Sequence, residues 1–306
     1  MTVSTTAQPL PPGVVVAPPL PELLRQVTIR RGVTGFLRGH PTVGIGGALL
    51  LCLVLIAIFA PYLGTVDPTA LAPAKRTRAP SADFWFGSDL LGRDVYSRVL
   101  YGSRVSLTVG LSVASLASLA GLAIGIVSGF VRWADGILMR VMDGLMSIPP
   151  ILLAIALMAL TRGSVGNVIV AITIAEIPRV SRLVRGVVLS LREQPYVDAA
   201  VASGTRTPMI ILRHILPNTL APMLVQATYI CASAMIVEAI LSFIGAGTPP
   251  TIPSWGNIMA EGRALWQVKP YIVFFPAAFL SVTVLAVNLL GDGMRDALDP
   301  RMARNL

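Results

Sequence analysis

The stretch DAAVASGTRTPMIILRHILPN, residues 198–218, decides the fold of this chain, because it is polar and lies between long apolar segments. Pro195, just before it, suits the first turn of a helix, where its missing N–H would have no partner in any case. Asp198 then lies early in that helix, where a carboxylate interacts favourably with the helix dipole. The side chains that follow are small, at Ala199, Ala200 and Ala202. Gly204 can adopt the left-handed conformation that ends such a helix.

A second helix is predicted directly after this glycine. Thr207 supplies its cap and Pro208 its first position, and the helix is expected to stop near Pro217. The product is a short helix, a glycine turn and a second helix, a shape that a groove on a partner protein could hold. The segment could also be a plain connection, although about forty residues is long for a helical hairpin. These residues alone leave both interpretations open.

Composition identifies the solvent around the flanking segments. The chain has 306 residues, of which 54% are hydrophobic and only 13% charged, and its mean hydropathy is +0.75. Soluble domains carry about twice that share of charged residues, so we expect this chain to lie in a lipid bilayer. Its formal net charge of +9 could suggest nucleic acid. The basic residues fall between apolar runs rather than along one polar face, however, and this argues against a nucleic-acid partner.

The apolar segments predict an all-α integral membrane protein with six transmembrane helices. A helix needs roughly 20 apolar residues to cross the hydrocarbon core of a bilayer. A segment at 165–177 is short for this purpose but can continue as a helix beyond Pro178. The other five expected spans are residues 43–63, 105–131, 144–160, 219–244 and 271–291.

Two regions follow from this division. We expect residues 1–40 to form an N-terminal tail that starts as a disordered segment rich in Pro, Val and Thr and continues as a short basic helix at the membrane surface. Residues 41–306 form the six-helix membrane domain. Its long connections are expected to be two outer loops, 64–104 and 246–270, and one inner loop, 178–218.

The first outer loop contains a predicted helix of its own. The segment GSDLLGRDVYSRVLYGSR, residues 87–104, offers Ser88 or Asp89 as a cap. Apolar residues then recur at helical spacing, which is typical of a helix lying on the membrane surface.

The basic residues also predict the orientation, because positively charged loops resist translocation. Six spans with an inner N-terminus place fifteen of the 24 Lys and Arg residues on the cytoplasmic side. These are Arg25, Arg30, Arg31, Arg38, Arg132, Arg140, Arg179, Arg182, Arg185, Arg192, Arg206, Arg213, Arg295, Arg301 and Arg304. Both termini and the 178–218 loop are therefore expected in the cytoplasm.

The sequence contains few of the patterns that signal chemistry. Its two lysines, Lys75 and Lys269, do not form a GK[ST] phosphate loop, so a nucleotide that drives this protein would bind to another chain. His40 and His214 are its only histidines, and we expect no metal site. The spans hold no nucleophile–base pair that would indicate an intramembrane enzyme.

Three acidic residues lie within or beside the expected spans, where a charge is expensive unless it is paired or faces water. Asp143 and Glu176 lie at helix-neighbour spacing from Arg140 and Arg179, so an ion pair is expected for each. Glu238 has no basic neighbour in the sequence. Its two open interpretations are a role near a transport pathway and a hydrogen bond to a neighbouring helix.

The stretch 198–218 resembles the EAA loop of ABC importer permeases. Asp198 stands where the general motif has Glu, and His214 stands where many members have Ile. A histidine followed by ILPN is similar to the peptide-importer branch. The motif positions in this sequence are Asp198, Ala199, Ala200, Gly204, His214, Leu216 and Pro217.

Three further stretches are similar to the C-type permease of dipeptide and oligopeptide importers. They are FGSDLLGRDVYSRVLYGSRVSL (86–107), MRVMDGLMSIPPILLAIAL (139–157), and EAILSFIGAGTPPTIPSWGNIMAEGR (238–263) with NLLGDGMRDALDPR (288–301). The resemblance covers nearly everything after residue 40.

The resemblance implies a type I ABC importer permease, a six-helix bundle with a cytoplasmic coupling helix and no catalytic residues. The coupling helix, with Thr207 and Pro208, would dock into one or two ABC ATPase subunits, which would bind ATP and Mg²⁺. A second homologous permease would complete a heterodimer in the inner membrane of a bacterium. An extracytoplasmic binding protein would deliver peptides.

Other cargo and another transport class remain open at this point. The same branch includes importers of nickel chelates and haem-like molecules, and the choice depends largely on the binding protein. A proton-coupled secondary transporter could use Glu238 and Glu176 as a relay, but matching broken helices in two halves of the chain are not found.

Overall fold

The computed structural model describes residues 39–298. The predicted disordered start and basic helix of the tail lie outside the described residues, up to residue 38, as do residues 299–306. No strand occurs between residues 39 and 298, where one isolated bridge joins Ser88 and Asp94. The α-helices are α3 (Pro41–Phe59), α4 (Val95–Phe130), α5 (Arg132–Met146), α6 (Pro150–Ala159), α7 (Val165–Arg192), α8 (Pro195–Ala202), α9 (Thr207–Ile210), α10 (Leu216–Phe243), α11 (Trp255–Gly262) and α12 (Tyr271–Leu298). The 3₁₀ turns are η1 (Ala60–Tyr62), η2 (Pro73–Lys75) and η4 (Arg263–Leu265), and η3 (Ile211–Ile215) is a π-helical turn.

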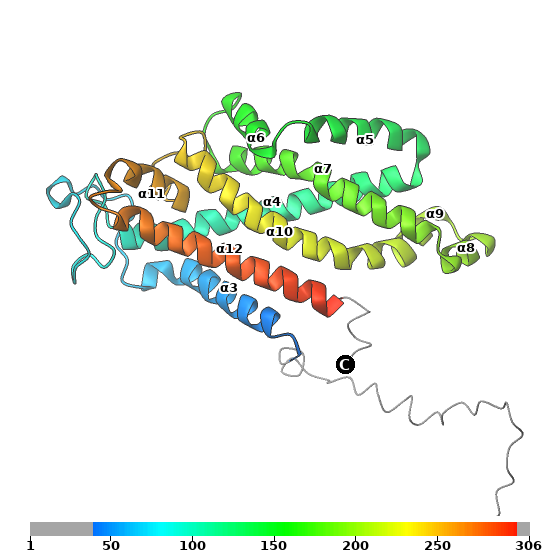
Figure 1. Ribbon diagram of the computed structural model, residues 1–306, viewed down its shortest axis with the longest axis horizontal. Coiled ribbons are helices and arrows are strands. Elements are labelled where there is room, and N and C mark those ends of the chain that lie inside the picture. The colour runs from blue at the N-terminus through cyan, green and yellow to red at the C-terminus, as the bar shows by residue number, and fades with distance from the viewer. Residues whose placement is uncertain (1–38, 299–306) are drawn as a thin grey trace, which may run out of the picture. The chain divides into compact units, whose positions relative to one another are not determined.

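The long helices α3, α4, α7, α10 and α12 run side by side (Figure 1). α8 and α9 lie at one end of this bundle, the α8 end, and α11 lies at the other, the α11 end (Figure 1). Within residues 39–298, four helices are long and apolar enough to cross a membrane. They are Pro41–Tyr62, Val95–Phe130, Thr207–Phe243 and Tyr271–Leu298. The all-helical membrane fold predicted from the sequence is confirmed.

The expected span 144–160 is broken rather than straight. α5 and α6 meet at an angle of 88°, and together they offer a fifth crossing. Pro149 and Pro150 follow the end of α5, and a proline both lacks the N–H that would continue a helix and disfavours helical backbone at the residue before it. The helix that begins at Arg132 therefore ends at Met146, and a new one starts at Pro150.

The short predicted span at residues 165–177 corresponds to α7, which continues through Pro178 to Arg192 as the sequence suggested. Length and apolarity alone do not identify it as a crossing, because Glu176 and the arginines after it interrupt the apolar run. α7 nevertheless lies in the bundle and makes its most extensive contact with α4.

The contact between α4 and α7 depends on three glycines, because a side chain at any of them would collide with a valine of α7. Without side chains, two helices can approach closely, as is common in membrane bundles. Each glycine meets the valine 59 residues further along the chain: Gly121 with Val180, Gly125 with Val184, and Gly129 with Val188.

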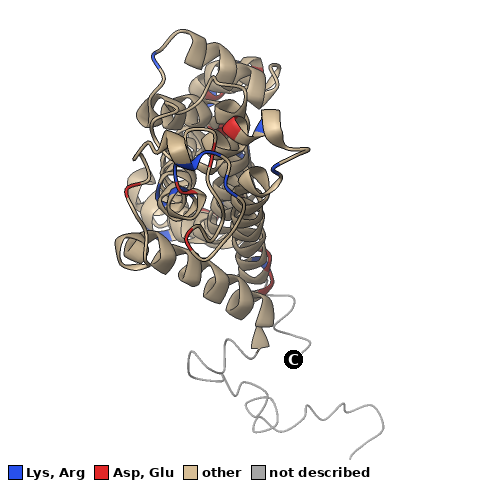
Figure 2. Ribbon diagram, turned by 90° about the vertical axis from the view of Figure 1, so that its left-hand side faces the viewer, with Lys and Arg blue, Asp and Glu red and all other residues tan. Residues whose placement is uncertain are grey.

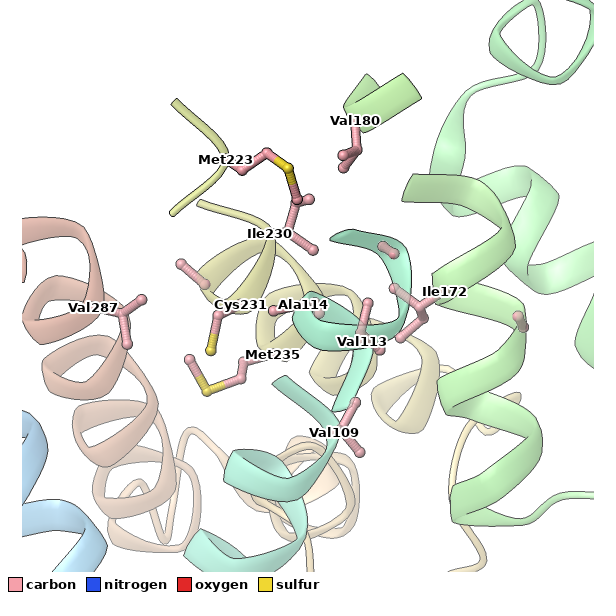
Figure 3. Packing of buried hydrophobic residues seen from close by; sticks show 14 of the residues in the cluster. Val109, Val113, Ala114, Ile172, Val180, Met223, Ile230, Cys231, Met235 and Val287 are labelled. Carbon is pink, nitrogen blue, oxygen red and sulfur yellow. The ribbon is translucent and has the colours of Figure 1, made fainter. Parts of the chain in front are cut away.

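The main apolar core lies between α4, α7, α10 and α12 (Figure 3). Val113 of α4 lies beside Ile172 of α7 in this view. Cys231 is a buried member of the cluster, and Met235 lies beside it on α10. This packing holds the four helices at fixed positions relative to one another.

The predicted surface helix in the first outer loop is not a separate element. Residues 95–104 are the first turns of α4, a single helix of 36 residues. Its cap is Asp94, whose side chain accepts from the backbone N–H of Ser97, rather than Ser88 or Asp89. The helical spacing of apolar residues was correct, but it belongs to the start of a long helix that packs against α11.

Candidate coupling site

The first part of the candidate site is α8, which begins at Pro195 as predicted. Val197 is buried in the main apolar core and fixes the helix to the bundle. Asp198 and Ala199 are exposed, and Ala200 is half-buried. The small side chains therefore leave the outer surface of α8 smooth and accessible.

Gly204 ends α8 with a positive φ of 75°, as predicted. The backbone N–H of Thr205 donates to the carbonyl of Ala200 at 3.0 Å, and that of Gly204 donates to Val201 at 2.9 Å. These two hydrogen bonds form a Schellman motif, which favours glycine at the left-handed position. Apart from the two neighbouring residues, no atom in residues 39–298 lies within 4 Å of the place where a Cβ would be built, so within this part of the chain only the backbone conformation restricts the position.

The second helix differs from the prediction at both ends. Its cap is Arg206, so Thr207 and Pro208 are its first two residues. It does not stop near Pro217, because α9, η3 and α10 form one continuous helical segment. In η3 the N–H of Leu216 bonds to the carbonyl of Ile211, five residues back. This wider turn changes the hydrogen-bond pattern just before Pro217, which has no N–H to donate.

The structure brings most of the predicted coupling residues to one surface at the α8 end. Ile210 and Ile215 are buried beneath it. His214 and Leu216 are half-buried, and the His214 ring lies 5.9 Å from the ring of Tyr196 on α8. The exposed members of the predicted set are Asp198, Ala199, Gly204, Thr207, Pro208 and Pro217.

Sequence reasoning missed the apolar side chains on this surface. They are Tyr196, Val201, Met209 and Leu212, all exposed. Val201 lies beside Gly204 in the turn, and Met209 follows Pro208 in α9. The sequence shows that these four residues are apolar, but apolar residues at these positions are equally consistent with packing in the core. We call α8, the glycine turn and α9 with these four side chains the coupling surface.

Asp143 and Glu176 both form ion pairs, and one of the two predicted partners is wrong. Glu176 pairs with Arg179 at 3.2 Å, as expected, and also accepts from Ser233 Oγ of α10 at 3.3 Å. Asp143 pairs with Arg182 of α7 at 2.5 Å rather than with Arg140. α5 packs against α7, which places Asp143 beside Arg182, an arrangement that spacing along one helix does not predict.

Glu238 is fully buried and hydrogen-bonded, which supports the second of its two interpretations. Ser242 Oγ donates to its carboxylate at 2.9 Å, and Ser106 Oγ of α4 lies 3.5 Å away. Ser242 Oγ is also 3.0 Å from Thr248 Oγ1, which accepts from Asn257 Nδ2 at 2.9 Å. Glu238 thus belongs to a polar network that joins α4, α10 and α11.

A second buried polar cluster at the α11 end was not predicted. Arg93 and Arg98 each pair with Asp89, at 2.7 and 2.6 Å. Both arginines also pair with Glu261 of α11. Figure 2, which looks onto this end, shows blue and red segments close together in the loops and mostly tan helices behind them. A buried arginine normally has an acidic partner. Glu261 is 163 residues from Arg98 in the sequence, so residue spacing did not predict this pair.

Comparisons with known proteins identify the family of this chain. The family model for the binding-protein-dependent transport system inner membrane component matches residues 121–304, which include the coupling surface. A probable peptide ABC transporter permease of Sinorhizobium fredii is 54% identical over 87% of this chain and 91% of the relative. A dipeptide transport system permease of Alkalihalophilus pseudofirmus is 41% identical over 84% and 85%, respectively. An oligopeptide transport system permease of Bacillus subtilis is 36% identical over 87% and 88%.

A solved structure supports the fold. A chain of the MetNI methionine ABC transporter, in an inward-facing conformation, superposes with a TM-score of 0.53 and 19% identity. The similarity covers 66% of this chain and 96% of that one. The family model and the identity to these relatives lead to one conclusion. The chain belongs to the family of binding-protein-dependent transport system inner membrane components, the permeases of ABC importers.

Proposed function

We propose that this chain is the non-catalytic permease subunit of an ABC importer that moves dipeptides or oligopeptides inward, driven by ATP hydrolysis in separate ATPase subunits. The substrate class is supported by the relatives, which carry peptide, dipeptide and oligopeptide transport in their names. The observation that supports the mechanism is the coupling surface. Its small and apolar side chains are exposed, and the buried residues Val197, Ile210 and Ile215 pack beneath them.

The coupling surface has the properties of a docking site for an ATPase subunit. Val201, Met209 and Leu212 are exposed large apolar residues that a groove would bury. Asp198 has no ion-pair partner among residues 39–298, so its carboxylate is available to a basic group on the partner. ATP and Mg²⁺ would bind to that ATPase, since the present sequence has no GK[ST] loop.

Movement at the coupling surface would reach the membrane through α10. α9, η3 and α10 form one segment of 37 residues, and at about 1.5 Å per residue such a segment is long enough to cross the bilayer. Glu238 links α10 to α4 and α11 near its far end. A displacement of α8 and α9 by the ATPase would therefore move a rigid element that spans the bundle.

The remaining partners follow from the family. A second homologous permease would complete the translocation pathway as a heterodimer, and an extracytoplasmic binding protein would deliver the peptide. The complex would lie in the bacterial inner membrane, with the coupling surface and both termini of this chain on the cytoplasmic side. Fifteen of the 24 basic residues then face the cytoplasm, in keeping with the preference of positive loops for that side.

Uptake by sealed vesicles tests this proposal. Vesicles that contain both permeases and the ATPase, with the binding protein outside and ATP inside, should accumulate a labelled dipeptide. Omission of the ATPase should abolish accumulation even when a proton gradient is applied. Persistent uptake driven by the gradient alone would contradict the proposal, and uptake of a nickel chelate or haem in place of peptide would contradict its substrate class.

A further inference from the structure

A cavity of about 350 Å³ at the α8 end lies where α4 ends, α5 begins and α7 finishes. Its walls carry two arginines, Arg132 and Arg192, and the hydroxyl of Ser128. It is separate from the coupling surface, although Arg192 precedes the first residue of α8 by only three positions. Cavities of this size hold small molecules or parts of larger ligands.

Ser128 indicates that the cavity receives a hydrogen-bond acceptor. Its side chain is only 3% exposed, and its Oγ has no hydrogen-bond partner among the described residues. A buried hydroxyl without a partner costs roughly 1–3 kcal/mol. An acceptor atom in the cavity would remove this penalty.

The two arginines make a negatively charged ligand favourable. Arg132 is exposed and has no ion-pair partner in residues 39–298. Arg192 donates to the carbonyl of Gly129 and lies 5.2 Å from the Phe130 ring, which fixes its guanidinium at the cavity. Only one of its nitrogens is used in that hydrogen bond, so further N–H groups are available to a ligand.

The start of α5 adds to this positive potential. α5 has 15 residues, and its cap, Val131, has no side-chain acceptor for the amides of the first turn. Free amides and the helix dipole at such a position favour an anion, above all a phosphate. Together with Ser128 and the arginines, they form a set of donors around one cavity.

Two carboxylates also line the cavity, and they restrict the class of anion. Asp135 is neutralised by Arg185, which donates to its two oxygens at 2.6 and 2.7 Å. Glu193 is exposed and has no ion-pair partner in the described part of the chain. A ligand with a phosphate next to a cationic group would pair with the arginines and with Glu193 at the same time.

The outer surface of α5 indicates where such a ligand comes from. Trp133 follows Arg132 and is 76% exposed. Ile137 and Val141 continue its line at four-residue spacing and are also exposed, at 60% and 53%. Leu189 extends the apolar border on the α7 side. An exposed apolar face with a tryptophan next to basic residues is typical of a helix at the boundary between headgroups and acyl chains.

We propose that this cavity binds the headgroup of a membrane phospholipid that carries a phosphate and a primary ammonium, as phosphatidylethanolamine does. The phosphate lies between Ser128, Arg132 and Arg192 at the start of α5. The ammonium lies beside Glu193. The acyl chains follow the exposed face of α5, and the bound lipid contacts the segment from which α8 emerges.

Native mass spectrometry of the full chain in mild detergent tests this site. Phosphatidylethanolamine, phosphatidylcholine, phosphatidylglycerol and inorganic phosphate are added separately to the wild type and to variants. We expect Arg132→Gln to weaken phosphatidylethanolamine binding about tenfold, the loss of one charge-assisted hydrogen bond. Ser128→Ala should also weaken it. Arg140→Gln removes the same charge from α5 outside the cavity and should leave binding unchanged.

The headgroup assignment has its own variant. Glu193→Gln should retain lipid binding but lose the preference for phosphatidylethanolamine over phosphatidylglycerol. Equal binding by the wild type and Arg132→Gln, with both proteins folded by circular dichroism, would overturn the site. If inorganic phosphate binds alone and displaces the lipid, the ligand of this cavity is not a lipid. Loss of lipid binding when a second permease copy assembles with this chain would also contradict the proposal.

Discussion

The guanidinium of Arg98 lies 2.6 Å from the carboxylate of Asp89, and both side chains are buried. Asp89 belongs to the loop before α4, whereas Arg98 lies in α4 itself and also pairs with Glu261 of α11. The pair therefore connects this loop, α4 and α11 at the α11 end of the bundle.

Replacement of Arg98 by alanine should destabilise the chain strongly. Removal of one partner leaves Asp89 buried with fewer compensating charges, which costs about 3–5 kcal/mol in comparable cases. Thermal unfolding in detergent should show a clearly lower midpoint for Arg98→Ala. Arg78→Ala is the matched control, because Arg78 is an exposed arginine of the same loop without an ion-pair partner in residues 39–298. A midpoint for Arg98→Ala equal to that of the control would contradict this assignment.

The close contact between α4 and α7 predicts intolerance of larger residues at Gly125. A Cβ there would lie 2.6 Å from the Cβ of Val184, so Gly125→Leu must separate the helices. Overpacking of this kind costs about 1–3 kcal/mol. Gly136 of α5 has open space around it, and Gly136→Leu should be neutral or slightly stabilising because leucine has the higher helix propensity. The order of the two melting temperatures is the measurement, and the reverse order would be the contradictory result.

At Gly204 the conformation and the size of a new side chain can be separated. Asparagine tolerates left-handed backbone, whereas a β-branched residue does not. We expect Gly204→Asn to keep near-normal association with the ATPase. Gly204→Val should lose most of it and uncouple ATP hydrolysis from uptake. Co-purification of the ATPase and the ratio of peptide transported to ATP hydrolysed provide the readouts; association that survives Gly204→Val would remove the support for docking here.

Glu238 should tolerate glutamine. The amide of Glu238→Gln keeps an oxygen that accepts from Ser242 Oγ and offers N–H groups to Ser106 Oγ, so the network remains bonded. Glu238→Leu leaves the buried hydroxyl of Ser106 without its partner and removes one of the partners of Ser242 Oγ; an unpaired buried hydroxyl costs roughly 1–3 kcal/mol. Peptide uptake and thermal stability should both be near normal for the first variant and reduced for the second. Loss of uptake without loss of stability in Glu238→Gln would instead indicate a role of the charge in transport.

The two ion pairs between α5 and α7 should differ in strength. Asp143 and Arg182 are both more than 40% exposed, at 62% and 49% of their side chains, and such pairs contribute about 0–1 kcal/mol. Asp135 is more buried and accepts two hydrogen bonds from Arg185. Asp135→Asn should therefore lower the melting temperature more than Asp143→Asn, and only the smaller effect should disappear at high salt.

The sequence predicted the local features of this protein better than its long-range contacts. Local backbone conformation determines which positions favour proline and glycine. The predicted positions of Pro195 at the start of α8 and of Gly204 in its final turn are confirmed. The helix end predicted near Pro217 is wrong, because a π-helical turn just before this proline allows the helix to continue past it. Asp143 and Glu261 form ion pairs with arginines on other helices. The spacing of residues within one helix does not predict such pairs.

The π-helical turn at Ile211–Ile215 gives the chain one residue more than a regular α-helix would use between α9 and α10. Each helical residue advances the direction of its side chain by about 100°. That single surplus residue therefore sets the angle at which the coupling surface faces outward relative to the faces of α10 inside the bundle. Under the proposed function, an insertion or deletion at this turn would therefore rotate the coupling surface relative to α10 and weaken the transmission of ATPase movement, although the residues of the surface itself would be unchanged.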